Sequence, residues 1–266
     1  MGTDLATSEL RLYGDLAVLA GEAHVTTPVG EPRSVKDLIE SVGVPHPEVA
    51  LILVDGHPVG FDHLVVGGER VAVYPPFHGI ELAGIPTVLP EPVAPRFVLD
   101  VHLGPLARRL RLLGVDCWYR TDTDDAELAR VAVDEDRILL TRDRQLLMRR
   151  TITHGYCPRS SDPDTQALEV VERYRLGDRL APFTRCVNCN AELARVPKAE
   201  VLEELPPATR EAFDDFARCT GCGQVYWPGS HLDAVNGFLE RVAALTSRPI
   251  ARTASGDPGA DRGGLR

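Results

Sequence analysis

The chain has 266 residues, of which 44% are hydrophobic and 26% charged, and its formal net charge at pH 7 is -10. This balance is typical of a globular protein and excludes collagen, coiled coil and wholesale disorder. No apolar run approaches the ~18 residues of a membrane span, and the first residues lack the basic and apolar regions of a secretory signal. We therefore expect a cytoplasmic protein with no membrane partner, and the length favours two domains.

The acidic charge is concentrated in the first third of the chain. Residues 1–94 hold 4 Lys and Arg against 13 Asp and Glu, whereas residues 95–231 hold 20 against 22. Of those 20 basic residues, 19 are Arg, and the guanidinium fork suits phosphate better than an ammonium group does. A nucleic-acid partner is therefore expected in the middle of the chain, although for any single arginine a solvated helix face is the simpler interpretation.

Residues 1–78 predict a small β-rich domain with one main helix. Ser34 predicts the N-cap of a helix over 35–42, whose apolar residues recur at helical spacing. Asp55-Gly56 predicts a type I′ hairpin turn, because both residues tolerate positive φ. The strands are predicted around Leu10 and Leu12, over 51–54 and over 71–74. This order is typical of a ubiquitin-like β-grasp roll.

The same order resembles the small sulfur-carrier proteins of thiamine and molybdopterin synthesis, because the last strand ends in Tyr74-Pro75-Pro76-Phe77. Those carriers need a C-terminal diglycine whose carboxylate is activated. Here the chain continues through His78-Gly79 instead. Sulfur transfer is therefore the weaker hypothesis, and we expect the domain to dock on an unidentified protein partner.

A proline-rich linker is predicted over 79–95, and a different pattern follows it. Short apolar strands then alternate with amphipathic helices, which predicts α/β units with a parallel sheet and helices on both faces. The strands are predicted over 96–99, 115–119 and 137–141, and the helices over 103–113 and 124–134. Gly114 is expected to end the first of these helices.

Acidic residues follow two of these strands. Asp100 comes after 96–99, and Asp143 comes after 137–141. Ligands of an open parallel sheet bind outside the carboxyl ends of its strands, and gathered carboxylates favour Mg²⁺ or Mn²⁺ because a cation offsets their repulsion. Such metals support phosphodiester cleavage. The start of the intervening helix carries further acidic residues, namely Asp122, Asp124, Asp125 and Glu127, and capping is the alternative for Asp124 and Asp125.

Two CxxC pairs stand 29 residues apart, and they comprise Cys186, Cys189, Cys219 and Cys222. Two tight turns that each offer two thiolates predict a tetrahedral zinc site, in which four sulfurs leave no open position and the ion is structural. The redox alternative needs a CxxC at a helix start, whereas Gly221 and Gly223 favour a zinc knuckle. A helical insertion is predicted over 208–216, between the pairs.

Residues 99–114, LDVHLGPLARRLRLLG, form the most specific motif. Together with TRDR at 141–144, THGY at 153–156 and the CxxC pairs, this motif strongly resembles the Mut-7 C-terminal ribonuclease family. That family has a PIN-like nuclease fold followed by a zinc ribbon, and bacterial members often carry an N-terminal ubiquitin-like domain. The resemblance covers about residues 5–77 and 96–232.

The resemblance implies a metal-dependent ribonuclease. It implies an acidic centre made of Asp100, Asp125 and Asp143, in which Asp100 and Asp143 hold magnesium or manganese, with Asp122, Asp124 and Glu127 as additional candidates. The arginines expected near the phosphate path are Arg108, Arg109, Arg142 and Arg144. Family members often have a lysine near Pro105, and Arg108 is expected to supply that charge here.

The domain order that follows has five parts. They are a ubiquitin-like domain over 1–78, a linker over 79–95, a PIN-like ribonuclease domain over 96–182, a zinc ribbon over 183–232, and a C-terminal helix with a disordered tail over 233–266. The ribbon is expected to aid RNA binding. The alternative function is a non-catalytic adaptor for a structured RNA such as tRNA, with the ubiquitin-like domain recruiting a partner.

Several single residues have less specific interpretations. Tyr226, Trp227 and His231 could contact unpaired bases, and packing in the ribbon is the plainer interpretation, above all for Trp227. Cys117 and Cys157 are expected to be small buried hydrophobes.

Overall fold

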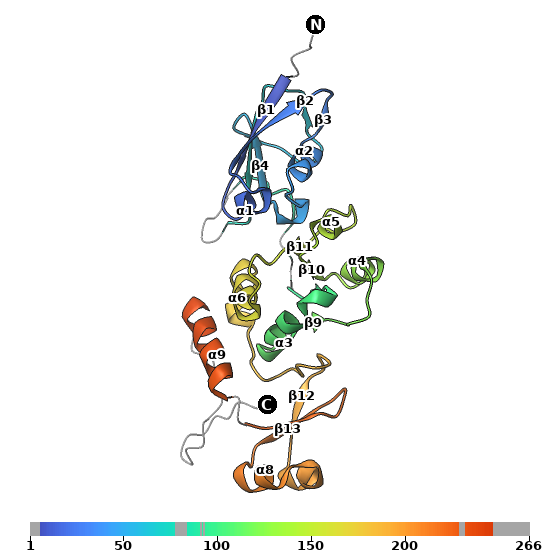
Figure 1. The fold of residues 1–266 in the computed structure, drawn as a ribbon, viewed down its shortest axis with the longest axis vertical. Coiled ribbons are helices and arrows are strands. Elements are labelled where there is room, and N and C mark those ends of the chain that lie inside the picture. The colour runs from blue at the N-terminus through green and yellow to red at the C-terminus, as the bar shows by residue number, and fades with distance from the viewer. Residues whose placement is uncertain (1–5, 78–83, 91, 93, 229–231, 247–266) are drawn as a thin grey trace. The chain divides into compact units, whose positions relative to one another are not determined.

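The computed structural model describes residues 6–77, 84–90, 92, 94–228 and 232–246 (Figure 1). The predicted disordered tail over 247–266 lies outside these residues. The chain divides into two compact units, each built from two separate segments. The first unit joins Met1–Pro95 to Asp124–Cys157, and the second joins Arg96–Thr123 to Pro158–Arg266.

The N-terminal segment of the first unit has the predicted β-grasp topology. Its five-stranded sheet has the order β2-β1-β7-β4-β5, with β1 parallel to β7 and the other neighbours antiparallel. The strands are β1 (Ala6–Leu12), β2 (His24–Val29), β4 (Leu51–Val54), β5 (His57–Pro58) and β7 (Arg70–Tyr74). Shorter elements are α1 (Leu16–Ala20), β3 (Arg33–Ser34), η1 (His46–Glu48) and β6 (Leu64–Val65).

Local sequence signals explain the helix and the hairpin of this segment. Helix α2 (Val35–Ser41) begins where the Ser34 hydroxyl accepts a hydrogen bond from the Asp37 N–H at 3.1 Å, so the predicted cap is confirmed. The apolar face of α2 is fully buried. Asp55 and Gly56 have φ of 47° and 86°, as the hairpin turn requires.

The second segment of the first unit contains α4 (Asp125–Asp134), β10 (Ile138–Leu140), α5 (Arg144–Leu147) and β11 (Gly155–Tyr156). Strands β10 and β11 are parallel. Buried polar contacts join this segment to the β-grasp segment. The carboxylate of Glu48, which is 0% exposed, accepts a hydrogen bond from the Cys157 N–H at 2.7 Å. The two segments therefore share one interior.

The second unit begins with β8 (Phe97–Leu99), η2 (Val101–Leu103), α3 (Gly104–Leu112) and β9 (Cys117–Trp118). Strands β8 and β9 are parallel, and α3 packs on α6 (Pro163–Arg173). Gly114 has φ of +82°, so it ends α3 as expected. Parallel strands with helices packed beside them confirm an α/β class for this part of the chain.

Helix α6 is absent from our sequence-based expectations, although it has ordinary start signals. Asp162 caps it by accepting a hydrogen bond from the Thr165 N–H at 2.8 Å, and Pro163 occupies its first turn. The segment after it contains η3 (Leu176–Arg179). Helix α9 (Leu232–Thr246) packs against α6.

The last part of the second unit is a three-stranded antiparallel sheet of order β12-β13-β14. Its elements are β12 (Leu193–Val196), α7 (Lys198–Val201), η4 (Leu202–Glu204), α8 (Pro207–Ala212), β13 (Phe216–Cys219) and β14 (Val225–Tyr226). The expected helix over 208–216 is wrong at its end. It stops at Ala212, because Phe216 begins β13 and packs against Val201 and Leu205.

None of the helices in the described part of the chain is both long and apolar enough to cross a membrane.

The buried Glu48 contact gives a test of the shared interior. We expect Glu48→Ala to lower the free energy of unfolding by about 2 kcal/mol, because it leaves a buried N–H without its acceptor. The exposed Glu9 of β1 is the control, and Glu9→Ala should change stability by less than about 0.5 kcal/mol. Urea unfolding measures both variants, and equal losses would contradict the account.

Candidate metal centre and nuclease residues

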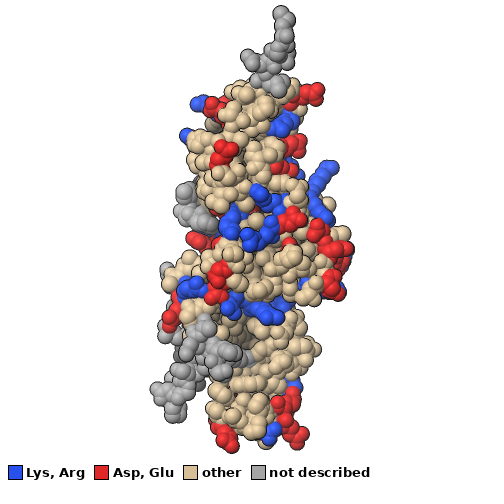
Figure 2. Space-filling view, in the orientation of Figure 1, with Lys and Arg blue, Asp and Glu red and all other residues tan. Residues whose placement is uncertain are grey.

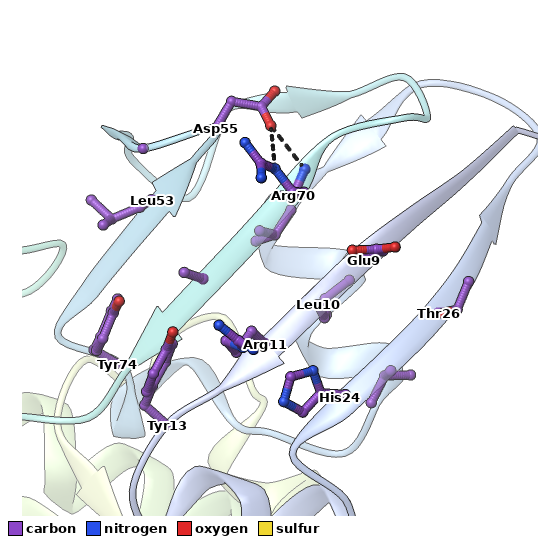
Figure 3. A pocket seen from close by; sticks show the side chains of 14 residues that line it. Glu9, Leu10, Arg11, Tyr13, His24, Thr26, Leu53, Asp55, Arg70 and Tyr74 are labelled. Carbon is purple, nitrogen blue, oxygen red and sulfur yellow. Dashed lines mark hydrogen bonds and ion pairs between the residues drawn. The ribbon is translucent and has the colours of Figure 1, made fainter.

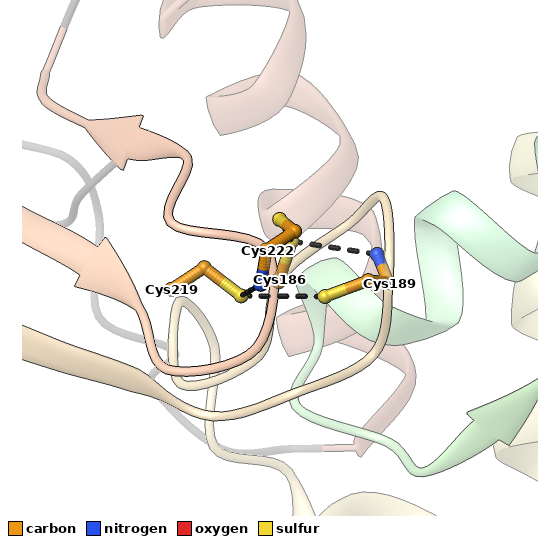
Figure 4. A group of neighbouring side chains, drawn as sticks. All are labelled: Cys186, Cys189, Cys219 and Cys222. Atoms are coloured by element: carbon orange, nitrogen blue, oxygen red, sulfur yellow. Dashed lines mark hydrogen bonds between the residues drawn. The ribbon is translucent and has the colours of Figure 1, made fainter.

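The four cysteines of the CxxC pairs come together in the second unit (Figure 4). Their sulfur atoms all lie within 4.8 Å of one another. The Cys186 and Cys222 sulfurs are 3.7 Å apart, and those of Cys189 and Cys219 are 3.3 Å apart. Zinc–sulfur bonds of about 2.3 Å in a tetrahedron place the sulfurs about 3.8 Å apart. The donor set therefore fits a tetrahedral metal ion such as zinc.

Hydrogen bonds surround these sulfurs. The N–H of Cys189 donates to Cys186 Sγ at 3.4 Å, and the N–H groups of Gly221 and Cys222 donate to Cys219 Sγ at 3.4 Å each. Burial raises the pKa of the Cys186 thiol, but the Tyr226 hydroxyl at 3.0 Å and the backbone N–H groups outweigh it and lower that pKa to about 7. These contacts favour the thiolate of Cys186, which is the form that binds a metal, whereas burial raises the pKa of the Cys189 thiol to about 12.

The aromatic side chains beside the cysteines pack in the apolar clusters of the β12-β13-β14 part of the chain. Tyr226 is buried against Cys186 and Cys219, and Trp227 packs on the apolar cluster around Phe216. The packing interpretation is therefore confirmed for Trp227, and it also applies to Tyr226. His231 lies outside the described residues. Cys117 and Cys157 are buried as predicted.

The two strand-end aspartates both act as N-caps. Asp100 is 8% exposed and its Oδ1 accepts a hydrogen bond from the His102 N–H at 3.3 Å, at the start of η2. Asp143 is exposed, and its Oδ1 accepts from the N–H groups of Gln145 and Leu146 at 2.8 and 3.3 Å. These bonds fix the orientation of each carboxylate at the end of its strand.

The acidic residues at the start of α4 have separate partners. Asp124 Oδ1 accepts from the Glu127 N–H at 2.8 Å, so the capping interpretation is confirmed for Asp124. Asp125 lies 3.3 Å from the guanidinium of Arg149. Asp122 pairs with Arg120 at 3.1 Å, and Glu127 pairs with Arg130 at 2.9 Å.

We looked for places where three or more His, Cys, Asp or Glu side chains lie close enough to share an ion. Among the described residues, the four cysteines form such a group. Asp100 belongs to the second unit, whereas Asp125 and Asp143 belong to the first. Their convergence on one magnesium or manganese ion stays a prediction.

The four predicted RNA-binding arginines divide into two kinds. Arg109 donates to the Asp164 carboxylate of α6 and lies 5.6 Å from the centre of the Phe238 ring. Arg144 Nη1 donates to the carbonyls of Leu19 and Gly43 at 2.6 and 3.3 Å. Arg108 and Arg142 are exposed. On the face drawn in Figure 2, basic side chains gather in patches bordered by acidic ones.

The β-grasp sheet carries a hollow that we did not predict from the sequence (Figure 3). It measures about 580 Å³ and is lined by residues of β1, β2, β4 and β7 and of the turns beside them. Tyr13 and Tyr74 stack at its edge with ring centres 4.2 Å apart, and Asp55 pairs with Arg70 at 3.8 Å. The period-two alternation of the strands is the signal that could have located this face.

Two protein-family models match this chain. The model of the Mut7-C RNAse domain matches residues 95–239, more than half of the chain, and the model of Mut7-C ubiquitin matches residues 7–81. The chain belongs to the Mut7-C RNAse domain family. The β-grasp segment is thus the ubiquitin-like domain of a Mut7-C protein, and the order of the two domains is the one that the sequence predicts.

Among solved structures, the chain is similar to small archaeal modifier protein 1 of Haloferax volcanii, with 22% identity, 27% of this chain and 99% of that chain covered, and a TM-score of 0.24. It is also similar to a Pyrococcus furiosus protein described as molybdopterin converting factor subunit 1, with 24% identity, the same coverage of both chains and a TM-score of 0.24. No curated protein matches the chain.

The cysteine geometry predicts tight metal binding by the Mut7-C protein. We expect the purified chain to hold about one equivalent of zinc, because four sulfurs complete its tetrahedron. Cys222→Ser should lower the zinc content and the thermal midpoint, whereas Cys157→Ser, which alters a buried cysteine outside the group, should keep its zinc. Elemental analysis measures the metal, and a zinc-free protein with paired disulfides would contradict the prediction.

The two arginines of the TRDR motif, Arg142 and Arg144, should contribute differently to stability. Arg144→Met removes two bonds to backbone carbonyls and should lower the free energy of unfolding by about 1 kcal/mol or more. Its near neighbour Arg142 is the matched control, and Arg142→Met should stay within about 0.5 kcal/mol of the parent. Chemical denaturation compares the two, and the reverse order would refute the packing role.

Proposed function

We propose that this Mut7-C protein is a metal-dependent ribonuclease that hydrolyses RNA phosphodiester bonds at a PIN-like acidic centre. The observation that carries the proposal is the match of residues 95–239 to the RNAse domain family. The placement of Asp100 immediately after β8 and of Asp143 three residues after the end of β10 supports it, because ligands of parallel strands bind at their carboxyl ends.

In the proposed mechanism, Asp100 and Asp143 hold magnesium or manganese and Asp125 completes the acidic centre. A metal held by these carboxylates would supply an activated water and stabilise the leaving oxygen. Both cap bonds of Asp143 that the structure describes fall on Oδ1, so its Oδ2 is the oxygen suited to the cation. The caps hold the carboxylates in one orientation before the metal arrives, which lowers the cost of binding.

The exposed arginines complete the proposed RNA site. Arg108 on α3 and Arg142 after β10 are exposed and bind RNA phosphates in this proposal, and Arg109 and Arg144 contribute through packing as well as charge. Phosphate contacts of this kind weaken as salt rises. A zinc ion held by the four cysteines would have no open position, so these cysteines would shape a zinc ribbon that aids RNA binding without taking part in the reaction.

The ubiquitin-like domain has a separate role in the proposal. It docks a protein partner, since its chain runs on past the last strand and offers no diglycine end for activation.

An Asp143→Asn variant tests the nuclease. Asparagine still caps a helix, so the fold should persist while a metal ligand is weakened. We expect RNA binding at least as tight as that of the parent and cleavage reduced by about 100-fold or more. The measurement is incubation with total RNA and with tRNA, with and without manganese, followed by mapping of the RNA ends.

Asp134→Asn, at the exposed end of α4, is the control and should cleave normally. Unchanged manganese-dependent cleavage by Asp143→Asn would remove the assignment of this residue. If the parent binds RNA at low salt but yields no product, the protein is an adaptor and the ribonuclease proposal fails.

A further inference from the structure

A buried arginine lies behind the first CxxC turn. Arg111 is only 3% exposed, although it belongs to the same arginine-rich helix as Arg108 and Arg109. It stands four residues after Ala107, on the apolar stripe of α3, so the helix directs its charge toward the interior. Neither the proposed phosphate path nor the acidic centre uses this residue.

The guanidinium group of Arg111 joins two parts of the second unit. Its Nε and Nη2 donate to the Cys117 carbonyl at 3.1 and 2.8 Å, at the start of β9. Its Nη1 donates to the carbonyls of Val187 and Asn188 at 3.2 and 2.7 Å. Val187 and Asn188 are the two residues between Cys186 and Cys189, so the guanidinium directly supports the first CxxC turn.

A side chain of the same turn makes a second connection. Asn190 Oδ1 accepts from the Cys117 N–H at 3.0 Å, and its Nδ2 donates to Asp116 Oδ1 at 2.8 Å. The turn is thus bound to β9 through the Cys117 N–H and through the Cys117 carbonyl. We expect the two bonds to make the position of the turn depend on the α3–β9 segment.

The charge of Arg111 lacks an ordinary counter-ion in these bonds. Within the described residues, its hydrogen-bond acceptors are all backbone carbonyls, and burial lowers its pKa. A buried charge is costly unless a group of opposite sign lies close by. The groups that oppose this lowering by their negative charge are the thiols of Cys117, Cys186 and Cys189 and the Asp116 carboxylate, and two of these thiols belong to the metal centre. Four thiolates around one divalent ion carry a net charge of about two negative units.

We propose that Arg111 is the counter-cation and positioning residue of the four-cysteine metal centre: its guanidinium holds the Cys186–Cys189 turn against the α3–β9 segment and offsets the excess negative charge of the metal-bound thiolates. This inference rests on the metal centre of the proposed function and is independent of RNA cleavage. Arg111 thereby couples metal binding by the four cysteines to the folding of the α3–β9 segment.

Zinc affinity of the full-length chain tests the proposal. The measurement is competition for zinc against a chromophoric chelator of known affinity. Arg111→Gln removes the charge and keeps a donor for the carbonyls, and it should weaken zinc binding by about 10- to 100-fold, the usual effect of losing an outer-shell partner. Arg111→Lys keeps the charge and should lose less. Arg195→Met, which alters an exposed arginine of β12, is the matched control and should bind like the parent.

A second measurement needs no variant. In the parent protein, the Arg111 Nε–H should be protected from solvent exchange when zinc is bound, and it should lose that protection when a chelator removes the zinc. NMR of arginine side chains observes this signal directly, so the proposal remains testable even if Arg111→Gln does not fold.

Two results would overturn the inference: a folded Arg111→Gln protein with the zinc affinity of the parent, or an Arg111 Nε–H signal that zinc removal leaves unchanged. A parent protein that binds no zinc would instead remove the metal centre on which the inference rests. Loss of RNA cleavage alone would affect the proposed function and leave the role of Arg111 standing.

Discussion

The approach of four sulfur atoms to within 4.8 Å is the constraint on which the C-terminal part of this Mut7-C protein depends. The sheet that carries them has a small core, with Val201, Leu205, Phe216 and Val225 buried at its centre. Burial of so few apolar side chains stabilises a domain weakly. A metal ion bound by the four cysteines would add to the stability of this part of the chain, because the free energy of metal binding at such a site is also folding free energy.

At the ends of two strands, a single aspartate side chain serves both the fold and the proposed chemistry. Asp100 and Asp143 cap the elements that follow their strands. A cap needs one carboxylate oxygen, so the other can face a cation without loss of the local structure. Asp124 caps α4 in the same way, through its Oδ1. Capping and metal binding are thus compatible at a strand end.

Local signals made much of this fold predictable from the sequence. Ser34, Gly114 and Asp55-Gly56 each specify a cap or a turn through their own backbone preferences, and the structure agrees at all of them. The cysteine group was predictable for the same reason, since each CxxC is a local turn. The end of α8 was not, because the burial of Phe216 depends on residues distant in sequence. The packing partners of Arg144 and Arg111 are likewise tertiary contacts that no local pattern encodes.

The central claim is that Asp100 and Asp143 bind magnesium or manganese. Titration with Mn²⁺ followed by NMR tests this claim most directly. The amides of His102 and Gln145 donate to these two carboxylates, so the account predicts that paramagnetic broadening reaches both amides at the lowest manganese concentrations and that added Mg²⁺ reverses it. Broadening that begins elsewhere in the chain and spares both amides would contradict the account.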